Sequence, residues 1–226
     1  MNNLIDLLQH QQLVWQGTRK TPVRDVDATG YSEIDQRLDG GFQKGVTEIQ
    51  ANYGIGELRV LLPVLKRAVT EERLIVFISP PGVVGAQALT EQGFLLGKVI
   101  VVYPDKQQEA LWAAEQCLRS GVCHSVVMWT NNALEVHQIK RLQVASEVGS
   151  SHQFILRTQK AESLSLPFDL SLSLLPHVQG LSARVNKRKG GWPSDSFIVN
   201  MVEQWPSLTL QPAPDNLIQF PSVNVG

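Results

Sequence analysis

Cysteine is scarce in this sequence, because only Cys117 and Cys123 occur among 226 residues. Two thiols cannot form the framework of a disulfide-stabilised domain, and their spacing is not the C-x-x-C pair of a zinc site. We expect both to be reduced. No apolar run reaches the roughly 18 residues that a membrane-spanning helix needs, and the start "MNNLIDLLQH" has no basic stretch ahead of an apolar core. The sequence therefore predicts a cytoplasmic protein without a membrane contact.

An excess of one charge is also missing. The chain has 20 Lys and Arg against 21 Asp and Glu. It therefore has no overall field that would draw it onto nucleic acid, and any contact with DNA must be local. Hydrophobic residues at 43% and charged residues at 18% are typical of a globular protein, and the length suits one principal domain.

The middle of the chain alternates between short apolar runs and helical patterns. Because helices between successive buried strands suit parallel connections, we expect an α/β fold, an open sheet of mostly parallel core strands flanked by helices. The predicted strands are 47–51, 74–79, 98–103, 125–129 and 153–157, and the predicted helices are 57–72, 86–93, 107–121 and 133–149.

The two ends of the chain have a different character from this domain, which we place at 28–202. Residues 1–27 comprise an amphipathic helix over 3–15, with Leu4, Leu7, Leu8 and Trp15 at helical spacing, and a linker. This helix either packs on its own domain or docks on a neighbouring subunit. The segments "LSARVNKRKGG" and "SDSFIVNMV" predict a C-terminal β-hairpin, and 203–226 is a proline-rich tail.

The stretch "GVTEIQANYGIGELRVLL" has the order strand, glycine loop, helix that nucleotide-binding proteins use. A working phosphate loop, G-x-x-x-x-G-K-[ST], offers a lysine to the phosphates and a hydroxyl to magnesium. Here Ala51 replaces the first glycine, Gly54 and Gly56 permit the turn, Glu57 replaces the lysine and Leu58 replaces the hydroxyl. Since a carboxylate repels a triphosphate, we expect no bound nucleotide and no other cofactor.

The run "TGYSEIDQRLDGGFQKGVTEI" resembles the segment before the phosphate loop in the RecA family, and the similarity extends over about 28–202. The resemblance implies a RecA-like sheet. RecA-like ATPases carry a catalytic glutamate and a magnesium-binding aspartate where this chain has Pro80 or Pro81 and Trp129. Lysine, hydroxyl, catalytic glutamate and Walker B aspartate are therefore all missing, which predicts a pseudo-ATPase without catalytic residues.

The motifs "GIGELRVLLP", "ISPPG", "ALWAAEQCLRSG", "IKRLQVASEVGS" and "VNKRKGGW" together resemble the ImuA family, which is RecA-like and SulA-related. This resemblance implies a non-enzymatic accessory factor for error-prone translesion DNA synthesis in the SOS response to DNA damage. The implied protein partners are an ImuB-like Y-family polymerase homologue, RecA and an error-prone C-family polymerase. The alternatives are a SulA-like inhibitor that binds the tubulin-like cell division protein, and an ATPase with an unconventional loop.

Two further groups of residues are candidates for contacts. Strand alternation predicts Arg184, Asn186 and Arg188 on one face of the hairpin and Lys187 and Lys189 on the other. With Trp192, these basic residues can contact single-stranded DNA or a protein partner, or they form a solvated edge. In the tail, Leu217, Ile218 and Phe220 form either a short docking peptide or an apolar group that folds back with Trp205.

The remaining chemistry-bearing residues predict no site. The five histidines show no i, i+4 pair and no acidic companion at metal spacing, so we expect no metal. No G-x-S-x-G elbow is present, which argues against a hydrolase. We expect Leu111, Trp112 and Leu118 to form the buried stripe of the 107–121 helix.

Overall fold

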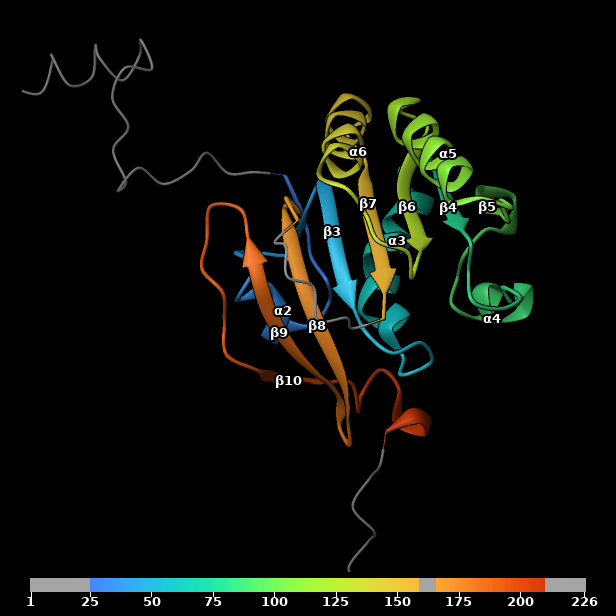
Figure 1. Ribbon diagram of the computed structural model, residues 1–226. Coiled ribbons are helices and arrows are strands. Elements are labelled where there is room, and N and C mark those ends of the chain that lie inside the picture. Colours follow the sequence, from blue (N-terminus) through green and yellow to red (C-terminus); the bar gives the residue numbers. More distant parts are fainter. Residues whose placement is uncertain (1–24, 159–165, 210–226) are drawn as a thin grey trace, which may run out of the picture.

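One eight-stranded sheet organises the chain (Figure 1). The computed structural model describes residues 25–158 and 166–209. Across the sheet the strand order is β10-β9-β8-β3-β7-β6-β4-β5, and every neighbouring pair from β8 to β5 is parallel. The core strands are β3 (Gly45–Gln50), β4 (Leu74–Ile78), β5 (Val99–Val102), β6 (Cys123–Trp129) and β7 (His152–Arg157). All five lie where the sequence predicted strands, so the mostly parallel α/β sheet is confirmed.

Helices cover both faces of the parallel strands (Figure 1). Helix α3 (Glu57–Thr70) packs in one hydrophobic core, whereas α5 (Gln107–Arg119) and α6 (Val136–Gly149) pack in a second core on the opposite face. β6 supplies both cores, because Val127 and Trp129 face α3 while Val126 and Met128 face α5 and α6. The predicted helices therefore begin where expected or within three residues of it. The smaller helices are α2 (Ser32–Asp35), α4 (Ala86–Glu91), η1 (Leu96–Lys98) and η2 (Pro206–Leu208).

β5 differs from the other core strands because it lies at the edge of the sheet. Its apolar run predicted burial on both faces, yet Ile100 is 43% exposed and Val101 is 36% exposed. Composition does not distinguish an edge strand from a central one, since edge position depends on the order of strands in the sheet.

Two hairpins extend the sheet at the opposite edge. β9 (Gly180–Arg188) pairs antiparallel with β10 (Phe197–Asn200), which confirms the predicted C-terminal hairpin. β8 (Leu170–His177) was not predicted as a strand. Its leucines and serines alternate, so that Leu170, Leu172 and Leu174 enter the core on the α3 side.

The RecA-resembling segment before β3 forms a tight structural turn. β1 (Val26–Asp27) pairs with β2 (Phe42–Gln43), and Asp35 accepts hydrogen bonds from the backbone N–H and the hydroxyl of Thr29, each at 2.8 Å. A side chain at Gly41 would place its Cβ 2.2 Å from the carbonyl oxygen of Asp27. These residues therefore shape the backbone, and the close approach requires glycine.

The predicted N-terminal helix over 3–15 and the tail residues Leu217, Ile218 and Phe220 lie outside the described residues. Trp205 lies inside them, and its indole N–H donates to the Tyr31 hydroxyl at 3.2 Å. Trp205 thus folds back onto the α3-side core, as one of the two alternatives predicted. Within 25–158 and 166–209, none of the helices has the length and apolar character needed to cross a bilayer.

Candidate functional site

The glycine loop joins β3 to α3 at the carboxyl edge of the sheet. Gly54 and Gly56 have φ angles of +86° and +93°, in the left-handed region that glycine adopts most easily. A Cβ at Gly56 would also lie 2.1 Å from the Arg59 guanidinium. The strand, turn and helix that the sequence predicted are therefore present, and Ala51 is buried at the start of the loop.

Glu57 places a carboxylate inside this loop. It is the first residue of α3 and only 5% exposed, and the backbone N–H of Gly54 donates to its two oxygens at 3.2 and 3.4 Å. In a phosphate loop, such N–H groups and the positive end of the helix would face a phosphate. Here the Gly54 N–H faces the chain's own carboxylate.

The other residues of the loop also lack groups for a nucleotide. Leu58 packs against the α3-side core, at the position where a magnesium-binding hydroxyl would stand. Arg59 donates from Nη2 to the Ile55 carbonyl at 2.9 Å, so this cation is directed back into the loop. A triphosphate at 4 Å from the Glu57 carboxylate would be repelled by about 4 kcal/mol per unit charge at an effective dielectric constant of 20.

A cavity of about 440 Å³ lies beside the loop, at the carboxyl ends of the parallel strands. The segments that follow β3, β4, β5 and β6 line it, including Tyr53, Pro81, Lys106 and Asn132. Crevices at this edge are where open α/β sheets commonly bind ligands. Pro81 and Trp129 both line this cavity. They stand where RecA-like ATPases carry the catalytic glutamate and the magnesium-binding aspartate.

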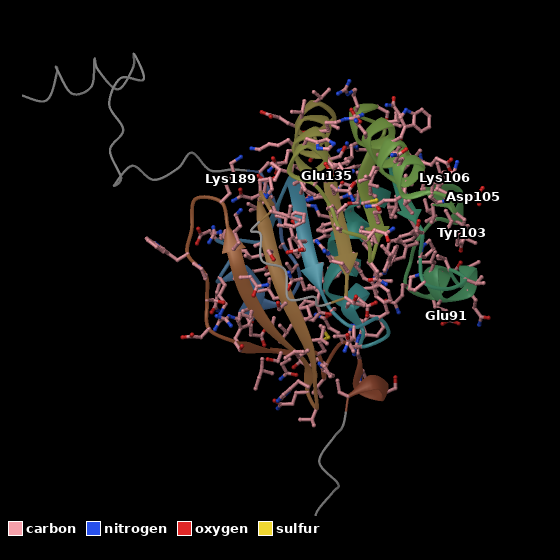
Figure 2. All side chains as sticks on the ribbon, in the orientation of Figure 1. Glu91, Tyr103, Asp105, Lys106, Glu135 and Lys189 are labelled. Atoms are coloured by element: carbon pink, nitrogen blue, oxygen red, sulfur yellow. The ribbon has the colours of Figure 1, made fainter. Side chains whose placement is uncertain are left out.

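Polar side chains, among them Tyr53 and Asp105, form part of the lining of this cavity. Burial, with a smaller effect of the Glu57 carboxylate, raises the pKa of Tyr53, whose hydroxyl donates to Asn131 at 2.9 Å. Asp105 and Lys106 lie on the side of the molecule that carries β5 (Figure 2). Within the described ranges, no group of three metal-ligating side chains gathers here. The cavity can accept a mixed polar and apolar group, such as a side chain of another protein.

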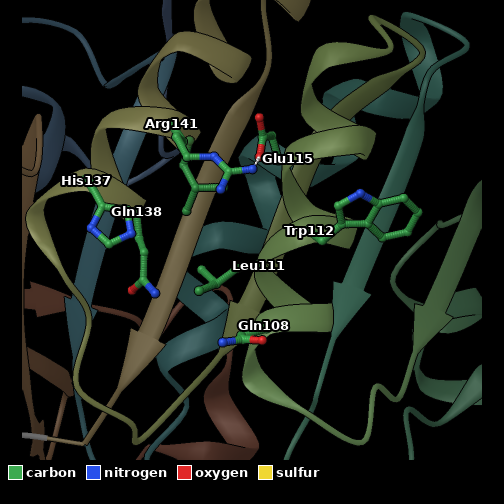
Figure 3. A pocket seen from close by; sticks show the side chains of 8 residues that line it. Gln108, Leu111, Trp112, Glu115, His137, Gln138 and Arg141 are labelled. Atoms are coloured by element: carbon green, nitrogen blue, oxygen red, sulfur yellow. Dashed lines mark hydrogen bonds and ion pairs between the residues drawn. The ribbon is translucent and has the colours of Figure 1, made fainter.

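A second hollow, of about 330 Å³, lies between α5 and α6 (Figure 3). Its wall includes Leu111, Trp112 and Glu115 of α5 and Arg141 of α6. Leu118 is fully buried as expected, but Trp112 is 62% exposed, so its predicted place in the core is wrong. Glu115 is buried and pairs with Arg141 and, at 3.3 Å, with Arg119. Tryptophan and arginine are enriched among the residues that contribute most to binding at known protein interfaces.

The basic hairpin is not the free patch that alternation predicted. A register shift between Ser171 and Leu172 of β8 places Arg188 opposite Leu170 and Lys187 opposite Ser171. Arg188 therefore lies on the core side, whereas Arg184 and Lys187 share the other face, so the predicted grouping is wrong.

The basic residues are also largely engaged. Arg188 donates to the Arg37 carbonyl at 2.8 Å and pairs with Asp39, Lys187 donates to the Leu166 carbonyl at 2.9 Å, and Lys189 lies 3.3 Å from Asp169. Trp192 is 89% exposed and Arg184 is exposed, so they stay accessible.

The amino edge of the sheet holds a buried cluster that the sequence analysis missed. Asp27, His124 and His152 are each at most 1% exposed. Asp27 Oδ2 lies 2.5 Å from His152 Nε2, 2.5 Å from Lys44 Nζ and 3.6 Å from His124 Nε2, and Arg67 contacts Oδ1 at 3.0 Å. The prediction that the histidines lack an acidic companion is therefore wrong for His124 and His152.

This cluster is a compensated ion-pair network. Its three side chains with metal-ligating atoms lie close enough to hold an ion. However, Lys44 Nζ lies 2.5 Å from Asp27 and 3.1 Å from His152 Nε2, so an ammonium already occupies the cation position. Burial lowers the pKa of His152 to about 4. Burial raises the pKa of Asp27, but interactions with His124, His152 and Lys44 outweigh it and hold this pKa far below its usual value.

One signal in the sequence can locate this cluster. Lys44, His124 and His152 lie at the amino ends of β3, β6 and β7, which are neighbours in the sheet. Amino ends of parallel strands meet at one edge. A search for ionisable residues at strand starts therefore finds three of the five residues of the cluster, Arg67 included, whereas spacing along the chain does not.

Comparison with known proteins shows which proteins this chain resembles. Residues 46–153 match the family model "Cell division inhibitor SulA", which covers β3 to the start of β7. SulA from Photorhabdus laumondii is 33% identical over 101 residues, which cover 45% of this chain and 56% of that protein. Over this part of its length the chain is similar to SulA proteins. In addition, RecA from Bdellovibrio bacteriovorus is 24% identical over 176 residues, 75% of this chain and 46% of RecA.

The chain thus spans about half the length of these two relatives. Among solved structures, the crystal structure of SulA from Pseudomonas aeruginosa matches with 25% sequence identity and a TM-score of 0.41. The match covers 50% of this chain and 98% of the SulA chain. The family match includes the loop with Glu57, α5 and the amino ends of β6 and β7. The upstream turn and the C-terminal hairpins lie outside it.

Proposed function

We propose that this SulA-related chain acts by binding other proteins and performs no nucleotide chemistry. The observation that carries the proposal is the Glu57 carboxylate, which receives the Gly54 N–H at 3.2 Å inside the loop. Leu58 and Trp129 stand at the positions for a magnesium-binding hydroxyl and aspartate, which further supports it. The fold is then a RecA-like sheet that has kept its shape and lost the groups that hydrolyse ATP.

We infer, as the first specific candidate, an inhibitor of cell division that binds the tubulin-like division protein. The family match over 46–153 and the 33% identity to a SulA protein support it. The contact is then made by exposed side chains of the matched region, of which Trp112 is the largest. Expression in a bacterium is expected to produce filamentous cells, and the purified chain is expected to reduce polymer formation by the division protein.

A variant pair sharpens this test. Trp112→Ala is expected to weaken the inhibition at least tenfold, whereas Trp192→Ala, which truncates an even more exposed tryptophan outside the matched region, leaves it unchanged. Cells of normal length at high expression, together with unaffected polymer formation, would reject the inhibitor candidate.

A second candidate is the accessory factor for error-prone lesion bypass. It is favoured by the similarity to RecA, which extends over 75% of this chain against 45% for SulA. Its partners are an ImuB-like polymerase homologue, RecA or an error-prone C-family polymerase. Deletion of the gene is expected to lower damage-induced mutation without altering cell length, and the purified chain is expected to bind the polymerase homologue. Unchanged mutation frequency with no such binding contradicts this candidate.

Absence of hydrolysis is common to both candidates. With ATP and magnesium, phosphate release is expected to stay at the level of a sample without protein, also when single-stranded DNA is added. Phosphate release that Glu57→Ala abolishes would instead assign the chain to the ATPases.

A further inference from the structure

Among the described residues, β5 forms an apolar edge of the sheet. It is the last strand in the sheet order and pairs only with β4 among the described residues. Val99, Ile100, Val101 and Val102 carry no charge. Edge strands of monomeric proteins are usually protected by charged side chains, proline or a covering element. This edge has none of these along the strand itself.

Both faces of β5 are partly accessible. Successive side chains of a strand point to opposite faces, and the neighbours Ile100 (43% exposed) and Val101 (36%) each keep exposed surface, while Val99 packs against the α3-side core and Val102 against the core on the α5 and α6 side. Leu95, Leu96 and Tyr103, next to the strand, are 54%, 46% and 60% exposed. The apolar surface therefore continues beyond the strand at both ends.

Hydrogen bonding to β4 decides which backbone groups of β5 point outward. The Ser79 N–H donates to the Val102 carbonyl at 2.9 Å, and Ile78 is the register partner of Val102. Val102 and, by alternation, Ile100 therefore direct their backbone groups at β4. Those of Val99 and Val101 point away from the sheet.

We propose that two copies of this chain pair antiparallel through β5, with Val101 on the twofold axis. In that register Val101 exchanges two N–H···O bonds with its own copy, and Val99 does so with Tyr103. The sheet then continues from one copy into the other. A closed, twofold arrangement of this kind uses the same patch on both subunits.

The strand is complementary to itself, which favours a second copy as the occupant. The facing pairs are Val101 with Val101, Ile100 with Val102 and Val99 with Tyr103, all β-branched or aromatic combinations that stabilise paired strands. Lys98 falls opposite Pro104 and Asp105 opposite Gly97, so no like charges face each other. Lys98 is moreover held by the Glu72 carbonyl at 2.9 Å.

The expected affinity is moderate. Four strand residues with Leu95, Leu96 and Tyr103 give an interface at the low end of specific contacts, below about 1,200 Å² in total. Buried area alone does not set affinity, and we expect weak association with a dissociation constant on the order of 10 μM. The pairing does not depend on the function proposed above.

Sedimentation equilibrium of the full chain over 1–200 μM tests the proposal. The wild type is expected to pass from monomer to dimer within this range. Val101→Lys brings two ammonium groups together on the axis and is expected to raise the dissociation constant at least tenfold. Ile198→Lys is the matched control, because Ile198 lies on the opposite edge strand β10 and is also 43% exposed. Circular dichroism verifies that both variants are folded.

Cross-linking tests the register. In an antiparallel hydrogen-bonded pair the Cα atoms lie about 5.5 Å apart, within the range of a disulfide. Val101→Cys is therefore expected to form a disulfide-linked dimer on mild oxidation, whereas Ile198→Cys is not. A monomer throughout the concentration range, a dimer that Val101→Lys leaves intact, equal weakening by Ile198→Lys, or no preference of Val101→Cys for cross-linking would each overturn the proposal.

Discussion

Buried carboxylates at the two ends of the parallel strands have different kinds of interaction partners. At the amino edge, Asp27 is met by Lys44, Arg67 and His152 from three separate parts of the chain. At the carboxyl edge, the described residues offer Glu57 no ion pair, and it accepts the backbone N–H of Gly54. The interactions at the amino edge thus connect distant segments of the chain, while at the carboxyl edge the anion and its hydrogen-bond donor come from the same short loop.

Removing the anion of the amino edge is expected to have the largest effect. Asp27→Ala leaves Lys44 and Arg67 without their partner beside a buried His152, and it should lower the free energy of unfolding by about 3–5 kcal/mol. Urea denaturation measures this loss. Asp39→Asn, at the exposed partner of Arg188, is the control and should cost less than about 1 kcal/mol. Equal losses in the two variants would contradict the account of the amino edge.

Lowering the pH is also expected to destabilise the amino edge, by somewhat less than Asp27→Ala does. The pKa of His152 is about 4 in the folded chain and about 6.5 when unfolded, so between these values the unfolded chain binds more protons. The free energy of unfolding should therefore keep its full value above pH 6.5. It should decrease by roughly 3 kcal/mol as the pH drops from 6.5 toward 4. The charged groups facing His152 are Asp27 and Lys44, with His124 beside it.

Denaturation at a series of pH values measures this slope. His152→Gln should flatten it between pH 4 and 6.5, whereas His137→Gln, at an exposed histidine, should leave it unchanged. A slope that survives His152→Gln would assign the pH dependence to another group.

A substitution at the carboxyl edge should lower the free energy of unfolding least. Glu57→Gln replaces the charged acceptor of the Gly54 N–H by a neutral one and should cost about 1 kcal/mol in the free energy of unfolding. Glu109→Gln is the matched control, because Glu109 is also an acidic residue in the first turn of a long helix but is exposed. Its expected cost is below about 0.5 kcal/mol. A larger loss for Glu109→Gln would show that helix charge, and not the loop contact, explains the effect.

Local pattern predicted most of the sheet. The apolar runs located β3 to β7, and helical spacing located α3 to α6, because both depend on burial of the segment itself. β8 was missed because Pro167, ahead of the strand, and Pro176, within it, indicated an interrupted segment, although Leu170, Ser171, Leu172 and Ser173 alternate as in a strand. The exposure of β5 could not be predicted from its composition, because it follows from strand order.

Among the candidate sites, too, those formed by residues close in sequence could be predicted, and those formed by distant residues could not. Glu57 could be placed in the loop because its neighbours in the sequence form the turn. The Asp27 cluster joins residues up to 125 positions apart, and only the sheet brings them together. The register shift at Ser171 and Leu172 reversed the expected faces of Lys187 and Arg188, and no nearby sequence feature marks that shift.

Calorimetric titration of the wild-type chain with ATP and magnesium tests the central claim most directly. With Glu57 in the place of the phosphate-binding lysine and Leu58 in the place of the magnesium-binding hydroxyl, no saturable binding is expected up to about 1 mM ATP. Binding with a dissociation constant below about 10 μM, lost when the loop is altered, would contradict the claim that the chain's own carboxylate has replaced the nucleotide.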